Sequence, residues 1–129
     1  LFTYTGKDGC RFAVLTFNAE SVPHNSNLLT SYLRQKQLAD CHYYLCGKPL
    51  PAIAPQNPGM YLLCRKDGAS VSVALWNIHE DIALSPKILL DEKFDCIDFI
   101  NCSGRLKGSE VILSDIPPYS FCGFEARKA

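Results

Sequence analysis

The sequence has no excess of either charge, because 13 Lys and Arg residues balance 13 Asp and Glu residues. It also contains no block of like charges, so the electrostatic basis for binding nucleic acid or an anionic membrane surface is missing. No apolar run approaches the roughly 18 residues of a membrane span, and the N-terminus lacks the basic segment and apolar stretch of a signal peptide. We therefore expect a soluble protein whose partners are neither nucleic acid nor membrane.

The length of 129 residues excludes a complete (β/α)₈ barrel, which needs about 250 residues. Hydrophobic residues make up 47% of the chain, enough for a core that needs no metal or disulfide to fold. We interpret residues 1–129 as a single domain. Because the chain begins with Leu1 rather than methionine, we also expect it to be part of a longer protein.

Cysteine is the residue type that stands out, with seven in the chain. The number is odd and no two cysteines show the CxxC spacing that zinc and redox sites favour, so neither a disulfide framework nor a zinc ribbon is indicated. Most lie in apolar runs, where a free cysteine behaves as a small hydrophobe. We expect reduced, mostly buried thiols in a cytoplasmic or anaerobic setting. They are Cys10, Cys41, Cys46, Cys64, Cys96, Cys102 and Cys122.

The first half of the chain predicts one strand and one helix. Residues 11–17 are rich in aromatic and β-branched side chains and predict a well-buried strand. The segment from Leu28 to Cys46 contains no proline or glycine, and its apolar residues recur on one side of a helix. We therefore expect an amphipathic helix there that packs on a later sheet. A polar residue at 25–27 would cap its start, and Gly47 would end it.

Four prolines mark residues 48–59 as an extended connection, because proline fixes φ and removes a backbone donor. Beyond it, short runs of strand-forming residues recur about every ten residues, which is typical of an antiparallel β-sandwich. Residues 66–68 predict a tight hairpin turn. Together with the strand at 11–17, this gives a mainly β fold of about seven strands with one packed helix. The other predicted strands are residues 60–65, 71–77, 87–90, 96–101, 110–113 and 121–126.

No local pattern points to catalysis, a metal or a cofactor. His79, Glu80 and Asp81 are adjacent, but three successive side chains cannot converge on one ion without an unusual loop. We interpret them as a solvated loop in which Asn77 and Asp81 organise the turn through side-chain hydrogen bonds to the backbone. A glycosidase acid pair would need a raised pKa, whereas we expect the nearby acidic residues to be exposed. Those residues are Asp91, Glu92, Asp95 and Asp98.

Two functional alternatives follow from single residue types. Exposed aromatic rings can stack on sugars, and the side chains that we nominate as carbohydrate contacts are Trp76, Tyr61 and Tyr119, although most aromatic residues are needed for the core. The second alternative is a nucleophilic cysteine. Its activating base would be one of the three histidines, His24, His42 or His79, yet no local signature supports such a pair.

Several segments resemble the closing β-sandwich domain of multidomain glycoside hydrolases, which follows their (β/α)₈ catalytic barrel. They are residues 73–77 with the following Asp81, residues 99–104, residues 111–113 and residues 116–121 before the last strand. The earlier half is similar in layout to segments of some β-galactosidase-like enzymes. It has a strand at 12–17, a helix with residues 33–38 and the stretch 47–51.

The resemblance implies an accessory role: a non-catalytic C-terminal domain of a carbohydrate-active enzyme that packs on the catalytic barrel or on a neighbouring subunit. No catalytic residue is carried over, because in these enzymes the acid and the nucleophile lie on the barrel. We therefore expect no catalytic, cofactor or metal-binding residue in this chain. A carbohydrate-binding module and a small cysteine-dependent enzyme are the alternatives.

Overall fold

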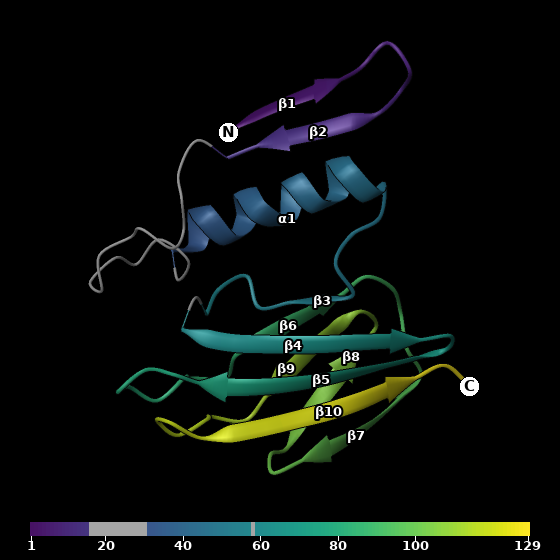
Figure 1. Cartoon of the computed structure of the whole chain (residues 1–129). Coiled ribbons are helices and arrows are strands. Elements are labelled where there is room, and N and C mark those ends of the chain that lie inside the picture. Colours follow the sequence, from purple (N-terminus) through teal and green to yellow (C-terminus); the bar gives the residue numbers. More distant parts are fainter. Residues whose placement is uncertain (16–30, 58) are drawn as a thin grey trace. The chain divides into compact units, whose positions relative to one another are not determined.

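The computed structural model describes residues 1–15, 31–57 and 59–129 (Figure 1). The chain divides into two compact units, Leu1–Leu50 and Pro51–Ala129, and the division falls in the proline-rich stretch. Each unit has its own backbone pairing, and no strand of one unit pairs with a strand of the other in the described residues. The expectation of a single domain stays a prediction about the whole chain.

The first unit contains a hairpin and a helix. Strands β1 (Phe2–Thr5) and β2 (Arg11–Val14) are antiparallel, and helix α1 spans Tyr32–Cys46. The hairpin contacts the helix at Tyr44, whose hydroxyl lies 2.6 Å from the hydroxyl of Thr5. The Arg11 guanidinium donates a hydrogen bond to the Tyr44 carbonyl oxygen and stands over its ring, 5.9 Å from the centroid. One tyrosine therefore joins the hairpin to the helix.

The structure corrects two sequence-based expectations for this unit. The strand predicted at 11–17 is mostly exposed as β2, with Phe12 and Val14 about half accessible, because β1 is its only partner strand in the described residues; residues 16–17 lie outside them. The helix begins at Tyr32, after an extended Ser31, and the predicted start at 28–30 and caps at 25–27 are not among the described residues.

The prediction that one apolar side of α1 is buried is also wrong. Leu33 and Tyr43 are exposed, and Cys41 is the one buried residue in this helix. The reason lies within the predicted apolar side itself, since Lys36 and Asp40 occupy it and form an exposed ion pair of 2.9 Å. The predicted end of the helix is confirmed, because Gly47 is left-handed, with φ 69°, and its N–H bonds to the carbonyl of Tyr43.

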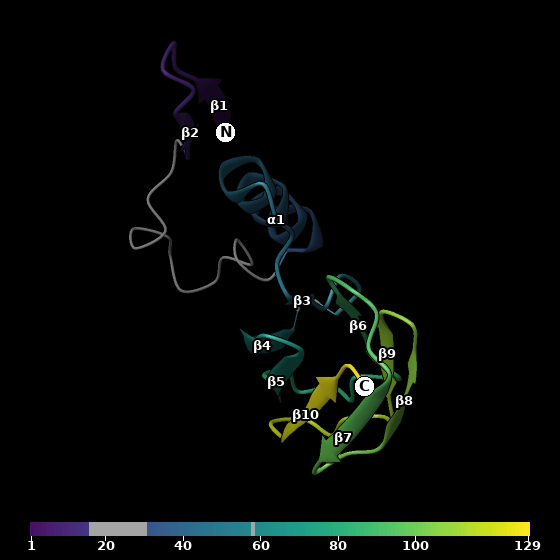
Figure 2. The same ribbon diagram turned by 90° about the vertical axis from the view of Figure 1, so that its right-hand side faces the viewer.

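The second unit is an antiparallel β-sandwich, which is the predicted fold, but it has eight strands rather than about seven and does not include β2. One sheet has the order β4-β5-β10-β7 and the other β3-β6-β9-β8 (Figure 2). The first sheet comprises β4 (Met60–Asp67), β5 (Ser70–Asn77), β10 (Phe121–Arg127) and β7 (Cys96–Ile100). The second comprises β3 (Ala52–Ile53), β6 (Lys87–Leu90), β9 (Glu110–Leu113) and β8 (Gly104–Lys107).

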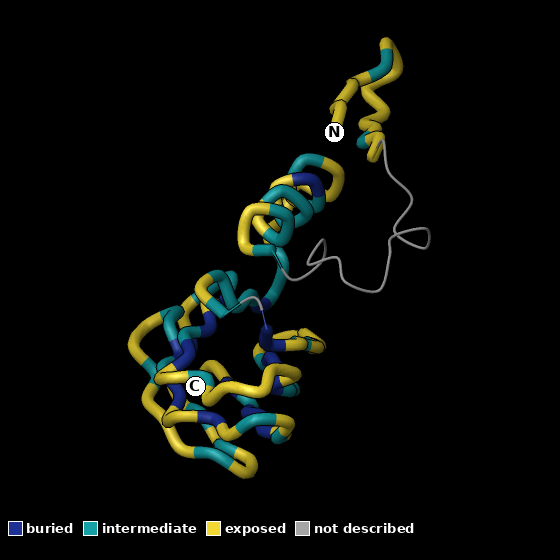
Figure 3. The backbone as a smooth tube through the Cα atoms, turned by 90° about the vertical axis from the view of Figure 1, so that its left-hand side faces the viewer, coloured by how far each residue is buried: buried dark blue, intermediate teal, exposed yellow. Residues whose placement is uncertain are grey.

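Alternation along the strands builds the core between these sheets. Val71, Val73 and Leu75 on β5 are buried, whereas the residues between them are not, because successive side chains of a strand point to opposite faces. Phe124 of β10 is 1% exposed and Val111 of β9 is fully buried. In Figure 3 the buried stretches of this unit are found on strands of both layers. Each such large side chain contributes about 1.5–3 kcal/mol to stability.

All six strands predicted beyond the proline-rich stretch are present within one or two residues of their predicted ends. The hairpin turn after β4 is also confirmed, since Gly68 has φ 56°. Three strands of the described residues were not predicted: β1, β3 and β8. Strand β1 is a four-residue exposed strand, β3 is only two residues long and follows Pro51, and β8 begins at Gly104 and ends just before Gly108, two residues of the kind that usually mark turns.

Candidate functional site

An aromatic row crosses the outer face of the first sheet. Tyr61 of β4, Trp76 of β5 and Phe121 of β10 stand directly opposite one another in register. The ring centroids of Tyr61 and Trp76 are 5.9 Å apart, and those of Trp76 and Phe121 are 4.9 Å apart. Tyr61 is 54% exposed and Phe121 40%, and Trp76 is half-buried between them. These three residues, the aromatic row, form a continuous ring surface beside solvent.

The next line of residues on this face is aliphatic. It runs Leu63, Ala74, Gly123 and Ile100, again by direct register across four strands. Leu63 is 50% and Ile100 is 54% exposed. Gly123 is buried, and a Cβ there would lie 2.6 Å from the carbonyl oxygen of Val73, so the backbones of β5 and β10 leave no room for a side chain. We call these four residues the aliphatic row.

Beyond the aliphatic row the same face becomes polar. Arg65 pairs with Asp67 on β4 at 3.5 Å, and Arg127 of β10 pairs with Asp98 of β7. The two apolar rows therefore make up one half of the outer face, which we call the apolar half, and carry no charged side chain. Exposed large hydrophobic residues that gather in one place mark interaction surfaces more often than isolated ones do.

The structure brings together two of the three nominated carbohydrate contacts, Tyr61 and Trp76. Tyr119 lies in the turn before β10, is 69% exposed and has an unusual left-handed backbone with φ 52°. Phe121 was missed, although its position one residue from the core-facing Cys122 was a signal that it lies on the outer face. The planes of neighbouring rings in the row are tilted by 52° and 46°. Sugar binding by these residues stays a prediction.

At the end of β5, directly after Trp76, Asn77 organises a polar centre within the core. It is 2% exposed, and its side-chain amide donates to the carbonyl oxygens of Asp81, Ile116 and Pro117 at 2.8–3.2 Å. Its side-chain oxygen accepts from the backbone N–H of His79. The prediction that this turn is organised by side-chain hydrogen bonds to the backbone is confirmed for Asn77, whereas Asp81 takes part through its backbone carbonyl and not, as predicted, through its side chain. His79, Glu80 and Asp81 are exposed, as expected for a solvated loop.

The acidic residues after β6 do not form an acid pair of the glycosidase kind. Lys66 reaches Asp91 and Glu92 at 2.6 Å each, and Lys128 reaches Glu92 at 2.6 Å. Hydrogen bonds from Lys128 and Lys66 lower the pKa of Glu92, whereas a general acid needs a raised one. Asp91 and Glu92 are half-buried rather than exposed as predicted, because they pair with Lys66 of the facing sheet, while Asp95 and Asp98 are exposed as expected.

Among the described residues, one cysteine side chain contacts a histidine side chain. The Cys46 sulfur lies 3.8 Å from Nδ1 of His42, one helical turn away on α1, and Cys46 is exposed. Among the described residues, no carboxylate bonds to His42 to orient it, and His24 is not among those residues. The geometry therefore lacks the third group that usually fixes a catalytic base.

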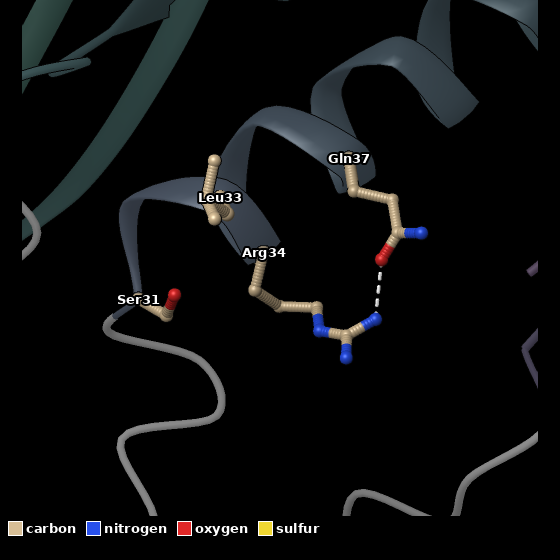
Figure 4. Close-up of a pocket in the computed structure, with 4 residues that line it drawn as sticks. All are labelled: Ser31, Leu33, Arg34 and Gln37. Carbon is tan, nitrogen blue, oxygen red and sulfur yellow. Dashed lines mark hydrogen bonds between the residues drawn. The ribbon is translucent and has the colours of Figure 1, made fainter.

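A pocket lies at the start of α1, lined by Ser31, Leu33, Arg34 and Gln37 (Figure 4). The guanidinium of Arg34 donates to the amide oxygen of Gln37, and both side chains reach toward each other across one turn of helix. None of the four is a carboxylate, imidazole or thiol. Within residues 1–15, 31–57 and 59–129, no three His, Cys, Asp or Glu side chains gather as a metal site would require.

Comparison of the chain with protein-family models, with curated proteins and with solved structures finds no match. In the part of the chain that the structure describes, no helix has the length and apolarity needed to cross a membrane. The outer face of the first sheet and the sequence motifs are therefore the features of this chain that bear on its function.

Proposed function

We propose that the chain is a non-catalytic accessory domain of a glycoside hydrolase and that the apolar half packs against the catalytic domain of that enzyme. The observation that carries the proposal is the uncharged outer surface formed by the aromatic and aliphatic rows. Cores of protein interfaces are enriched in aromatic residues and depleted of charge. A central Trp flanked by two rings is the kind of cluster that dominates binding energy.

The resemblance to closing sandwich domains supports the enzyme class. Two of the segments that carry it, residues 73–77 with Asp81 and residues 116–121, come together around Asn77, because this residue bonds to Asp81 on one side and to Ile116 and Pro117 on the other. These segments flank β5 and β10, the two central strands of the first sheet. The residues that resemble the family are therefore the ones that hold the aromatic row in place.

The alternative of a carbohydrate-binding module is less well supported by the geometry of this face. Sugar recognition combines a flat stacking surface with hydrogen bonds to hydroxyl groups, but the rings here are tilted by about half a right angle. In the two rows, the polar side-chain atoms are the Tyr61 hydroxyl and the Trp76 indole nitrogen. Such a face offers few hydrogen-bonding groups, so it is better suited to contact with apolar side chains of a protein than to binding a polyhydroxylated ligand.

The cellular setting that we propose is the cytoplasm. All seven cysteines are free thiols, three of them exposed, which is the state that a reducing compartment maintains. The formal charge of zero is compatible with a domain whose partner is recognised by apolar contact rather than by electrostatic steering.

Coexpression tests the proposal. The chain is produced together with the glycoside hydrolase catalytic domain encoded in the same or an adjacent reading frame, and copurification is measured. Leu63→Glu places a charge in the apolar half at an exposed position, whereas the control Ser72→Glu places the same charge on the polar half of β5. We expect the wild type and Ser72→Glu to copurify with the catalytic domain. We expect Leu63→Glu not to copurify with it.

Failure of the wild type to copurify, or equal retention of both variants, would overturn the docking proposal. A glycan titration is run in parallel, read through the fluorescence of Trp76, the single tryptophan. A saturable shift with a defined glycan that Trp76-preserving Tyr61→Ala abolishes would replace the docking proposal with the carbohydrate-binding one. Hydrolysis of an aryl glycoside by the chain alone would contradict both.

A further inference from the structure

Two thiols from different parts of the sequence meet where β7 and β10 lie side by side. Cys102 follows β7 by two residues, and Cys122 is the second residue of β10. The two strands are antiparallel neighbours, with Ile100 opposite Gly123. The Cys102 thiol donates to the carbonyl oxygen of Gly123, the residue that directly follows Cys122, at 3.4 Å. After burial, the neighbouring Cys102 is the second cause that raises the pKa of the Cys122 thiol. The fold therefore makes these two thiols neighbours.

The partners of Cys64, Cys96 and Cys46 are not thiols. Cys64 bonds to the backbone of Ala52, Cys96 donates to the carbonyl oxygen of Arg127, and Cys46 contacts His42. Cys122 is 1% exposed and belongs to the core, whereas Cys102 packs against that core and is half-buried. One thiol of the pair is thus within reach of a small reagent, and the other is behind it.

We propose that Cys102 and Cys122 form an intramolecular disulfide when the chain meets a low-molecular-weight disulfide such as oxidised glutathione. The Cys102 thiolate attacks one sulfur of glutathione disulfide, which forms a mixed disulfide and releases one glutathione. The Cys122 thiolate then attacks the Cys102 sulfur and expels the second glutathione. The protein loses two protons and two electrons, and both glutathione molecules leave as thiols.

The second exchange is the slow one. Burial, with Cys102 beside it, raises the pKa of the Cys122 thiol to about 12, so its thiolate is scarce at neutral pH. Closure of the bond should therefore accelerate roughly tenfold for each pH unit over the neutral to mildly alkaline range. Once formed, the bond closes the loop of residues 103–121, which carries β8 and β9, onto the strand that holds Phe121.

The experiment treats the whole chain with a mixture of oxidised and reduced glutathione, blocks remaining thiols in acid and maps disulfides by mass spectrometry. Tryptic cleavage leaves Cys96 and Cys102 in one peptide, so variants are needed to assign the bond. We expect the crosslink to Cys122 in the wild type and in the control Cys96→Ser, and its loss in Cys102→Ser. The oxidised wild type should also unfold at a temperature higher by roughly 10 °C.

Three results would overturn the proposal. One is a fully oxidised sample in which Cys122 is still a free thiol and glutathione occupies only exposed cysteines. Another is loss of the crosslink in Cys96→Ser rather than in Cys102→Ser. The third is a crosslink that forms only in denaturant, because the proposal requires the folded chain itself to bring the two thiols together.

Discussion

The side-chain nitrogen of Asn77 lies 3.2 Å from the carbonyl oxygen of Ile116, although the two residues are 39 positions apart in the sequence. The same amide also reaches Asp81 and Pro117, and the backbone N–H of Asn77 donates to the carbonyl oxygen of Ser120. These bonds connect the loop after β5 to the turn before β10. They satisfy carbonyl groups at a position where water has little access.

Replacement of Asn77 by alanine should lower the free energy of unfolding by about 3 kcal/mol, because buried carbonyl oxygens lose their donor and a small cavity forms. Chemical denaturation followed through Trp76 fluorescence measures the change. Ser120→Ala is the control in the same turn, since Ser120 donates to Pro117 from an exposed position and should cost less than about 1 kcal/mol. Equal losses in the two variants would show that Asn77 is not the organising residue.

Asn77→Asp removes the amide donor without changing the size of the side chain, so it separates the loss of hydrogen bonds from the formation of a cavity. The aspartate has nearly the same shape, but its carboxylate would face three carbonyl oxygens as a buried charge. We expect it to be at least as destabilising as alanine at pH 7 and to recover part of the loss in acid, where the protonated group can donate one hydrogen bond. Denaturation midpoints at pH 7 and pH 4 test this, and a stability gap to the wild type that widens in acid would contradict it.

Gly123→Ala tests the close approach of β5 and β10. The new Cβ would lie 2.6 Å from the carbonyl oxygen of Val73, a backbone atom that cannot rotate away. We expect a loss of about 2 kcal/mol from the resulting strand displacement. Ala74→Ser adds one atom at the neighbouring position of the aliphatic row and serves as the control. The measurement is the urea midpoint, and an unchanged midpoint for Gly123→Ala would mean that the strands separate at no cost.

The sandwich was predictable because apolar and polar residues alternate along its strands, and this alternation can be read from each short segment by itself. In β5, buried valine and leucine residues alternate with less buried ones, and a strand needs no distant residue to produce that pattern. Helix α1 was predicted less well, because a charge pair sits among the apolar residues on which the amphipathic interpretation rested. Strand β3 has two residues and gives no periodic signal at all.

The candidate site was predicted in part for a related reason. Tyr61 and Trp76 lie on two strands of one hairpin, so a turn at Gly68 already places them near each other. Phe121 belongs to a strand that arrives 45 positions after Trp76 and pairs with it only in the folded sheet. Sequence alone cannot give that register, nor the ion pairs between Lys66 and the acidic residues that follow β6.

The thiols should react in an order set by the fold. Burial raises the pKa of Cys64 and raises that of Cys122 to about 12, against an ordinary value of 9.0. At pH 8 the Cys122 thiolate is then about a thousandfold scarcer than for an ordinary thiol. We expect iodoacetamide to label the exposed Cys10 and Cys46 well before Cys64 and Cys122 in the native chain, and all of them at similar rates in denaturant.

Site-resolved mass spectrometry gives these rates. Rapid native labelling of Cys122 would contradict the burial of β10. The same data test the cysteine-enzyme alternative, because a Cys46 activated by His42 would react far faster than Cys10 and would slow in the variant His42→Ala. We expect comparable rates for Cys46 and Cys10 and no effect of His42→Ala.

The ion pairs of Lys66 connect the two sheets, since Lys66 ends β4 while Asp91 and Glu92 follow β6. The hydrogen bonds that Lys66 donates to Asp91 and Glu92 raise the pKa of Lys66 above 10.5, and the hydrogen bonds that Glu92 accepts from Lys128 and Lys66 lower the pKa of Glu92 below 4.5. A carboxyl group whose pKa is lowered by folding stabilises the folded state at pH values above its pKa in the unfolded chain, and this stabilisation is lost as the pH falls. An ammonium group whose pKa is raised by folding stabilises the folded state at pH values below its pKa in the unfolded chain, and this stabilisation is lost as the pH rises.

The melting temperature should therefore be highest between about pH 5 and pH 10 and should fall on both sides. Glu92→Gln removes the Glu92 carboxylate, so the fall in acid should become shallower while the fall above pH 10 persists, because Asp91 still bonds to Lys66 at 2.6 Å. Salt near 1 M should reduce the wild-type advantage over Glu92→Gln, since these groups are partly exposed. Thermal unfolding from pH 3 to 11 measures each limb, and an acid limb as steep in Glu92→Gln as in the wild type would show that other carboxylates control it.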